Sequence, residues 1–308
     1  MKELIIATRK SKLALWQSEF VKDFLEKTHK ISVSLQGFKT KGDVLLDSPL
    51  AKIGGKGLFT KELEESMLRK EAHLAVHSLK DVPSFFPSGL VLAAISKREE
   101  SNDVMLSQKY KDLIALPMNA KVGTTSLRRS MQLKFIRPDL NIISLRGNVN
   151  SRIQKLKDGE FDAIILALAG VKRLNLDKEV NFIYIFSKDE LIPAAAQGAL
   201  GIEAIDDEEI LTLLKCLNDE DAFIETKIER DFIRTLDGGC QVPIGVNAQL
   251  KNDEICIRAV LGLPDGSEKL KEKIFVKKSE FNDIGEKFAN DFIKKGAKEL
   301  LERALKMV

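Results

Sequence analysis

Arginine side chains recur beside glycine and hydroxyl residues at three places where a strand is predicted to end. They lie in residues 123–129 (GTTSLRR), in residues 145–149 (LRGNV), and at Arg173, which follows the apolar run 163–170. The start of a helix favours anions, and arginine pairs with carboxylates through two hydrogen bonds. Any one of these turns is equally well explained as a capped helix with solvated charges. Three of them at one edge of a sheet favour an anion-binding site at that edge.

Residues 77–83 (HSLKDVP) bring an imidazole, an amine and a carboxylate into a predicted loop after the strand 74–76. One interpretation is a turn that holds a local ion pair between Lys80 and Asp81. The other is that Asp81 is placed for proton transfer or for stabilising a cation. The residues alone leave both interpretations open.

Cys240 is the best candidate nucleophile among the 3 cysteines of the chain. It follows two glycines in a predicted loop, where the backbone can present the sulfur outward, and an exposed loop thiol is the better nucleophile. Cys216 is expected on a helix and Cys256 in an alternating strand, both as buried packing residues. No CxxC pair occurs, so neither a disulfide framework nor a zinc site is predicted.

Residues 42–58 form a long connection punctuated by glycines, which indicates either a lid or a plain surface loop. Its glycine run 54–57 lacks the spacing and the hydroxyl residue of a phosphate-binding loop. The sequence also contains no HExxH or GxSxG motif, so the common metalloprotease and serine hydrolase signatures are missing.

The composition is ordinary for a globular protein, with 44% hydrophobic and 31% charged residues in 308. Lys and Arg number 49 against 46 Asp and Glu, and a net charge of +3 is too small to predict a nucleic-acid-binding protein. The N-terminus resembles neither a signal nor a transit peptide, and no apolar run is long enough to span a membrane. Together with the few cysteines, these features predict a cytoplasmic protein.

Short strands alternate with amphipathic helices up to about residue 197, which predicts an α/β layer fold. A polar hinge at 96–103 separates two such units. In the second unit, Leu127, Met131 and Phe135 are expected on one face of a helix. A helix, alternating strands and one long final helix predict a small α+β domain from residue 219 onward. The expected domains are 1–96 with about 194–217, then 101–190, and finally 219–308.

Taken together, these motifs resemble the porphobilinogen deaminase (hydroxymethylbilane synthase) family. The matching segments, in order, are ATRKSKLALWQ, GDVLLDSPLAKIGGKGLF, HSLKDVP, VGTTSLRR, LRGNV, PAAAQGALGIE and GGCQVPIG. They span almost the whole chain, and GGCQVPIG together with HSLKDVP is highly specific. The resemblance implies two α/β domains arranged as in periplasmic binding proteins, an active cleft between them, and a small C-terminal α+β domain.

The resemblance implies a transferase that condenses four porphobilinogen molecules head-to-tail into hydroxymethylbilane, with release of ammonia, in tetrapyrrole (haem) biosynthesis. Cys240 would carry a dipyrromethane cofactor through a thioether bond. The enzyme assembles this cofactor from its own substrate, so no metal is needed. Asp81 would be the catalytic carboxylate, which accepts hydrogen bonds from pyrrole N–H groups and stabilises the cationic azafulvene left when ammonia departs.

The resemblance also implies residues that bind the anionic cofactor and substrate. The residues implied for the cofactor, besides Cys240, are Ser78, Lys80, Asp81, Thr124, Ser126, Arg128, Arg129 and Arg146. The residues implied for the substrate are Arg9, Ser11, Lys56, Phe59, Arg146, Arg152, Arg173 and Gln197. Each porphobilinogen brings two carboxylates, so the growing chain requires many fixed cations. The family expectation is a monomer that uses neither nucleic acid nor membrane and that could hand its product to uroporphyrinogen-III synthase.

The sequence departs from the family pattern at three places that carry no assigned chemistry. Asn102 stands where a hinge arginine is usual, Phe85 and Phe86 replace polar residues, and Ala196 replaces a common glycine. The competing class is a carboxylate-binding protein without chemistry. That class suits the first two domains, but it predicts an export signal and gives no role to Cys240.

Overall fold

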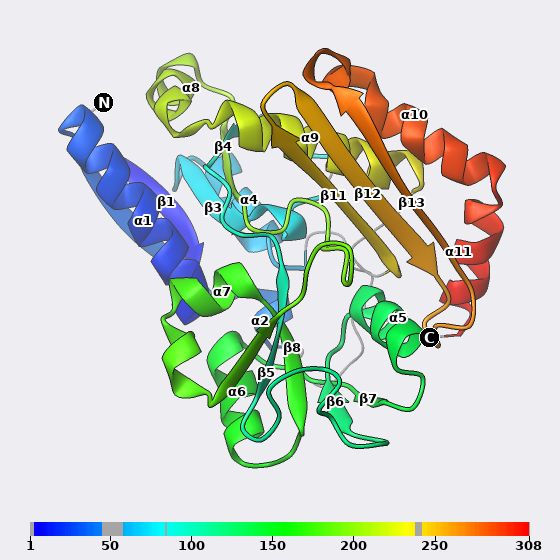
Figure 1. The fold of residues 1–308 in the computed structure, drawn as a ribbon. Coiled ribbons are helices and arrows are strands. Elements are labelled where there is room, and N and C mark those ends of the chain that lie inside the picture. The colour runs from blue at the N-terminus through cyan, green and yellow to red at the C-terminus, as the bar shows by residue number, and fades with distance from the viewer. Residues whose placement is uncertain (1–2, 45–57, 84, 238–241, 308) are drawn as a thin grey trace. The chain divides into compact units, whose positions relative to one another are not determined.

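The computed structural model describes residues 3–44, 58–83, 85–237 and 242–307. The chain divides into two compact units, each made of two chain segments (Figure 1). The first unit comprises Met1–Glu99 with Ala199–Phe223, and the second comprises Glu100–Gly198 with Ile224–Val308. Lys56 and Cys240 lie outside the described residues.

The first unit is built on a five-stranded sheet of order β2-β1-β3-β10-β4. The strands are β1 (Glu3–Arg9), β2 (Ser32–Phe38), β3 (Leu74–Ser78), β4 (Leu90–Ile95) and β10 (Leu200–Ile205). β1 is parallel to β2 and β3, whereas β10 is antiparallel to β3 and β4. The helices are α1 (Lys12–His29), α2 (Lys41–Val44), α4 (Lys61–Leu68) and α8 (Glu208–Leu214), with short 3-10 turns η1 (Leu79–Asp81) and η3 (Lys215–Leu217).

Side-chain alternation along β1 explains how this sheet is covered on both faces. Leu4 and Ile6 point to the core that α1 completes, whereas Ala7 faces the core that α4 completes. Ser11 caps α1, because its side chain accepts a hydrogen bond from the backbone N–H of Ala14. The helix therefore starts directly after β1 and positions the residues between them.

The second unit contains a sheet of order β7-β6-β8-β5-β9. Its strands are β5 (Asp103–Ser107), β6 (Lys121–Gly123), β7 (Asn141–Ile143), β8 (Ala163–Ala167) and β9 (Phe182–Ile185). Its helices are α5 (Leu127–Ile136), α6 (Val149–Lys157) and α7 (Leu168–Arg173), followed by the 3-10 turn η2 (Leu176–Glu179). β6 is parallel to β7 and β8, and β5 is antiparallel to β8 and β9. Both five-stranded sheets thus share one topology, in which the reversed strand, β10 or β5, begins just after the chain passes from the other unit.

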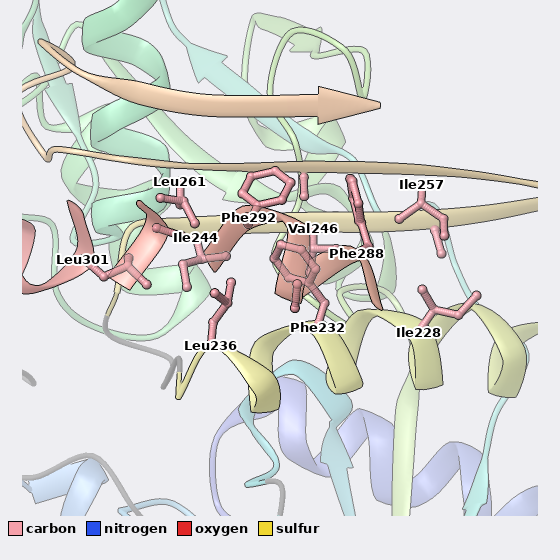
Figure 2. Packing of buried hydrophobic residues seen from close by; sticks show 14 of the residues in the cluster. Ile228, Phe232, Leu236, Ile244, Val246, Ile257, Leu261, Phe288, Phe292 and Leu301 are labelled. Carbon is pink, nitrogen blue, oxygen red and sulfur yellow. The ribbon is translucent and has the colours of Figure 1, made fainter. Parts of the chain in front are cut away.

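The C-terminal part of the second unit is an antiparallel sheet with helices packed on it. It comprises α9 (Glu220–Thr235), β11 (Ile244–Lys251), β12 (Glu254–Gly262), β13 (Lys269–Lys277), the 3-10 turn η4 (Lys278–Glu280), α10 (Phe281–Lys294) and α11 (Ala297–Leu305). Phe232 of α9 packs against Phe288 and Phe292 of α10 (Figure 2). Its ring centroid lies 5.5 Å from that of Phe288 and 5.3 Å from that of Phe292. Val246 and Ile257 of the sheet complete this core.

The predicted fold class is confirmed: the chain forms two α/β sheets and a C-terminal α+β part. The strand expected at 74–76 lies in β3. The division into three domains stays a prediction.

Two local predictions are wrong. The long final helix is two helices, because Gly296 adopts a φ of 89° and starts α11. Cys216 is exposed in the short turn η3 rather than buried on a helix.

Gly285→Ala is expected to lower the free energy of unfolding by about 1–3 kcal/mol, although alanine is the better helix former. A Cβ at this position would lie 2.4 Å from the carbonyl oxygen of Ile228 on α9, and backbone cannot yield as a side chain can. Chemical denaturation measures the difference. Glu286→Ala, at an exposed neighbour on the same helix, is the control and should change stability by less than about 0.5 kcal/mol. A fully stable Gly285→Ala protein would contradict the close approach of the two helices.

Candidate functional site

The carboxyl ends of β1, β2 and β3 lie at one edge of the first sheet, because these neighbouring strands are parallel. Arg9 ends β1 and Ser11 follows it, while Ser78 ends β3 and is followed by Lys80 and Asp81. The structure therefore brings these predicted residues to the same edge, which is where ligands bind in open α/β sheets.

Arg9 lies between a carboxylate and an aromatic ring. Its guanidinium donates hydrogen bonds to Asp43, and its central carbon lies 4.4 Å from the centroid of the Phe59 ring. Burial raises the pKa of the Asp43 carboxyl, but the hydrogen bonds and charge of Arg9, with Thr40, outweigh burial and hold the pKa below its ordinary value. The predicted substrate contacts Arg9 and Phe59 are adjacent. Asp43, which orients Arg9, was not identified as a site residue from the sequence.

The turn that carries Asp81 is anchored at its start and open at its end. The Ser78 hydroxyl accepts a hydrogen bond of 2.8 Å from Gln17, and the Leu79 N–H donates to the carbonyl oxygen of Ala199 at 3.0 Å. Leu79 is fully buried, whereas Asp81 is exposed. A carboxylate exposed on an anchored turn can face a ligand at the sheet edge, which supports the interpretation that Asp81 takes part in chemistry.

In the second unit, the three arginine-bearing turns follow β6, β7 and β8. These strands are neighbours and parallel, so the turns with Arg128 and Arg129, with Arg146, and with Arg173 lie along one edge. The predicted convergence of the three turns is confirmed by this strand order. Arg146 and Arg152 are each half-buried.

Hydroxyl and backbone groups shape these turns. Ser126 is the N-cap of α5 and accepts a hydrogen bond from the Arg129 N–H at 3.4 Å, while the Thr124 hydroxyl accepts one from the Ser126 N–H at 3.2 Å. In the next turn, Nε of Arg152 donates to the carbonyl oxygen of Gly147 at 2.7 Å, and Gly147 has a φ of 114° that favours glycine. The hydroxyls predicted to bind ligand therefore also fix the helix start.

Arg128 and Arg129 converge on Asp103, the first residue of β5. Nη1 of Arg128 lies 2.5 Å from Oδ2, and Nη2 of Arg129 lies 2.7 Å from Oδ1. Burial raises the pKa of Asp103, but the two guanidiniums overcome it and hold that pKa well below its ordinary value. Asp103 meets the arginines because β5 is antiparallel to β8 and begins where β8 ends. In the described part of the chain, Nε and Nη2 of Arg128 donate to no other group.

Gln197 and Arg173 are buried against the segments that lead from one unit to the other. Nε2 of Gln197 donates to the Ser101 carbonyl at 2.7 Å and to Oδ1 of Asp103 at 3.1 Å. Nη2 of Arg173 donates to the Gly198 carbonyl at 2.7 Å. These contacts connect both crossing segments to the arginine edge.

Two of the departures from the family pattern lie in the same segments. The Asn102 side chain donates to the Phe186 carbonyl at 2.8 Å and so links the first crossing segment to the end of β9. Ala196 adopts a φ of 58°, in the left-handed region that favours glycine, and its N–H donates to Glu229. The common glycine at this position would adopt that conformation without strain.

The predicted residues thus form two sets, one at a sheet edge in each unit. The first set is Arg9, Ser11, Phe59, Ser78, Lys80 and Asp81. The second set is Thr124, Ser126, Arg128, Arg129, Arg146, Arg152, Arg173 and Gln197. Within the described ranges, no group of three or more His, Cys, Asp or Glu side chains could hold a metal ion. No helix in those ranges combines the length and the apolar character needed to cross a membrane.

Two family models match nearly the whole chain. Residues 4–212 match "Porphobilinogen deaminase, dipyromethane cofactor binding domain", and residues 223–294 match "Porphobilinogen deaminase, C-terminal domain". The porphobilinogen deaminase of Campylobacter jejuni subsp. jejuni serotype O:23/36 (strain 81-176) is 76% identical over 99% of this chain and 100% of its own length. That of Campylobacter concisus (strain 13826) is 63% identical over 100% of both chains. Among solved structures, the methionine binding protein MetQ aligns at 10% identity over 72% of this chain and 92% of its own, with a TM-score of 0.46, too low to bear on fold or function.

Proposed function

Because the chain belongs to the porphobilinogen deaminase family, we infer that it condenses four porphobilinogen molecules head-to-tail into hydroxymethylbilane. The observation that carries this conclusion is the match of both family models, over residues 4–212 and 223–294. In each condensation the aminomethyl C–N bond of one substrate breaks, ammonia leaves, and a C–C bond forms to the pyrrole of another. The attacked pyrrole carbon then loses its proton. One water supplies the hydroxyl group of hydroxymethylbilane when the finished chain is released. This reaction is a step of tetrapyrrole biosynthesis.

The dipyrromethane cofactor of the family fits the residues of the second unit. The cofactor carries carboxylates, and the arginine edge offers cations whose donors are not all used: Nε and Nη2 of Arg128 donate to no other described group. When bound, the cofactor supplies the attachment point for the growing chain. Cys240 would hold it through a thioether, with Ser126 and the arginine edge binding its carboxylates.

In the first unit, Asp81 would serve as the catalytic carboxylate. Its exposure at the end of an anchored turn supports a contact with pyrrole N–H groups and with the cation that forms when ammonia leaves the substrate. Arg9 would bind a substrate carboxylate, and Phe59 beside it would stack near the pyrrole. Three domains, at 1–96 with about 194–217, 101–190 and 219–308, would carry these residues.

The cellular location and the oligomeric state of the enzyme are inferred from its sequence. The few cysteines and the lack of a CxxC pair support a cytoplasmic location. We propose a monomer that needs no nucleic acid or membrane and passes its product to uroporphyrinogen-III synthase.

Incubation of the purified protein with porphobilinogen tests the proposed function. One ammonia should be released for each porphobilinogen consumed, and mass spectrometry should detect a linear tetrapyrrole. Binding of porphobilinogen without release of ammonia would instead favour the carboxylate-binding protein without chemistry.

Arg146→Ala is expected to slow elongation about tenfold to a hundredfold, because each lost charge-assisted hydrogen bond costs about 1.5–3 kcal/mol. Arg146→Lys should recover only part of the rate, since lysine cannot pair bidentately. Arg146 suits this test because it is half-buried, whereas loss of Arg128 also strips a buried partner from Asp103. Arg303→Ala, at an exposed arginine on α11 that pairs with Glu268, is the control. Equal rates for Arg146→Ala and Arg303→Ala would remove Arg146 from the binding set.

A further inference from the structure

A cluster of three ionisable side chains is buried in the first unit, beside the turn that carries Asp81. His77 on β3 is 7% exposed, Glu203 on β10 is fully buried, and Glu64 on α4 is 9% exposed. The imidazole Nε2 of His77 lies 3.0 Å from Oε2 of Glu203. None of these residues belongs to the set assigned to ligand binding.

The chemistry of this cluster makes His77 and Glu203 depend on each other. In the described part of the chain, no lysine or arginine pairs with Glu203, and its second oxygen, Oε1, is buried without a hydrogen-bond partner. Burial raises the pKa of the Glu64 carboxyl, and the negative charge of Glu203 raises it further. A buried carboxylate in this setting requires a cation or a donor, and His77 is the group placed to supply one.

The pair lies one residue before the turn. In the antiparallel pairing of β3 with β10, His77 is opposite Gly201 and Ser78 is opposite Leu200. Leu79 then packs so closely on β10 that a Cβ on Gly201 would lie 2.8 Å from its side chain. The direction in which the chain leaves β3, and hence the place of Asp81, is therefore set where β3 is held to β10.

We propose that His77 and Glu203 act as positioning residues, whose buried contact fixes the end of β3 and thereby the place of the Asp81 carboxylate. Apolar residues of similar volume often stabilise a fold as well as a buried polar pair does, so stability alone does not explain the contact, whereas the geometry that it imposes does. The inference rests on the proposed function, because it assigns its effect to the turnover of that same site.

Glu203→Gln, made in the unsubstituted protein and in an Asp81→Glu background, tests the inference. The amide keeps the shape of the side chain and removes its charge. In the unsubstituted background we expect kcat to fall on the order of tenfold with little change in KM, because a displaced catalytic group slows the chemical step. In the Asp81→Glu background the carboxylate is already displaced, so the same substitution should lower kcat by less than about twofold.

Glu65→Gln, at an exposed carboxylate on α4, is the matched control and should leave kcat unchanged in both backgrounds. If the Glu203→Gln protein does not fold, Glu203→Asp is used instead. The shorter aspartate keeps the charge and draws the carboxylate away from His77. Equal losses of kcat in the two backgrounds, or a lower melting temperature with normal kcat, would overturn the inference and leave the pair with a structural role. Absence of ammonia release by the unsubstituted protein would overturn the proposed function and this inference with it.

Discussion

Cys240→Ser is expected to yield folded protein that carries no cofactor and releases no ammonia. The thiolate is a far stronger nucleophile than a hydroxyl, so serine cannot replace it in forming the covalent attachment. The segment that holds Cys240 follows α9 and precedes β11, and its flanking residues Leu236 and Ile244 are both buried in the C-terminal core. Exchange of one sulfur for one oxygen between two anchored ends should therefore leave the fold intact.

Intact mass spectrometry checks this prediction directly. The unsubstituted protein should exceed its sequence mass by one dipyrromethane, with the increment on the peptide that contains Cys240. The Cys240→Ser protein should show its sequence mass alone. Cys216→Ser is the matched control, because Cys216 is exposed but desolvation raises the pKa of its thiol and leaves less thiolate. An increment that persists in Cys240→Ser, or that disappears in Cys216→Ser, would assign the attachment to another residue.

The elements that position the site could be predicted where local periodicity and strand direction determine them. Leu4 and Ile6 alternate toward one core, and Ser11 begins the next helix, so β1 and α1 follow from neighbouring residues. The meeting of the arginine turns follows from the parallel order of β7, β6 and β8. An alternation of strands and helices is sufficient to predict that these strands are parallel.

The contacts that could not be predicted join residues far apart in the sequence. Asp103 is 25 residues before Arg128 and 94 before Gln197, and it joins them only because β5 is antiparallel to β8. No local pattern marks it, so the arginines of α5 were assigned to ligand alone. His77 likewise depends on Glu203, 126 residues away on β10.

The catalytic assignments could not be made from residue types and periodicity, as the fold could, and came from the family motifs. Residue types alone left Asp81 as either an ion-pair partner or a catalytic carboxylate, and only the family motif favoured chemistry. The structure adds that the turn η1 is anchored through Ser78 and Leu79 while Asp81 is exposed. Exposure is what separates the two interpretations experimentally, because removing an exposed charge costs little stability.

Asp81→Asn is expected to lower kcat about a hundredfold to a thousandfold while the protein stays folded and keeps its cofactor. Departure of ammonia leaves a cation on the substrate, and a later step removes a proton from the newly joined pyrrole. An ionised carboxylate stabilises that cation and accepts hydrogen bonds from pyrrole N–H groups. The amide keeps the shape and one acceptor oxygen but loses the charge. Asp81→Glu should therefore retain more activity than Asp81→Asn, because the charge survives in a displaced position.

Steady-state rate and melting temperature, measured on the same variants, separate the two interpretations of Asp81. A structural ion pair with Lys80 predicts a lower melting temperature with nearly normal turnover. A catalytic carboxylate predicts a much lower turnover with a nearly normal melting temperature. Asp23→Asn, at an exposed aspartate on α1 of the same unit, is the matched control for loss of one surface charge. Its turnover should equal that of the unsubstituted protein, because the charge it removes is not at the sheet edge that carries Arg9 and Asp81. A near-normal rate for Asp81→Asn would remove Asp81 from the chemistry. The role of stabilising the cation would then have to be assigned to another acidic group at that edge, and Asp43, held beside Arg9, is the described carboxylate placed to take it.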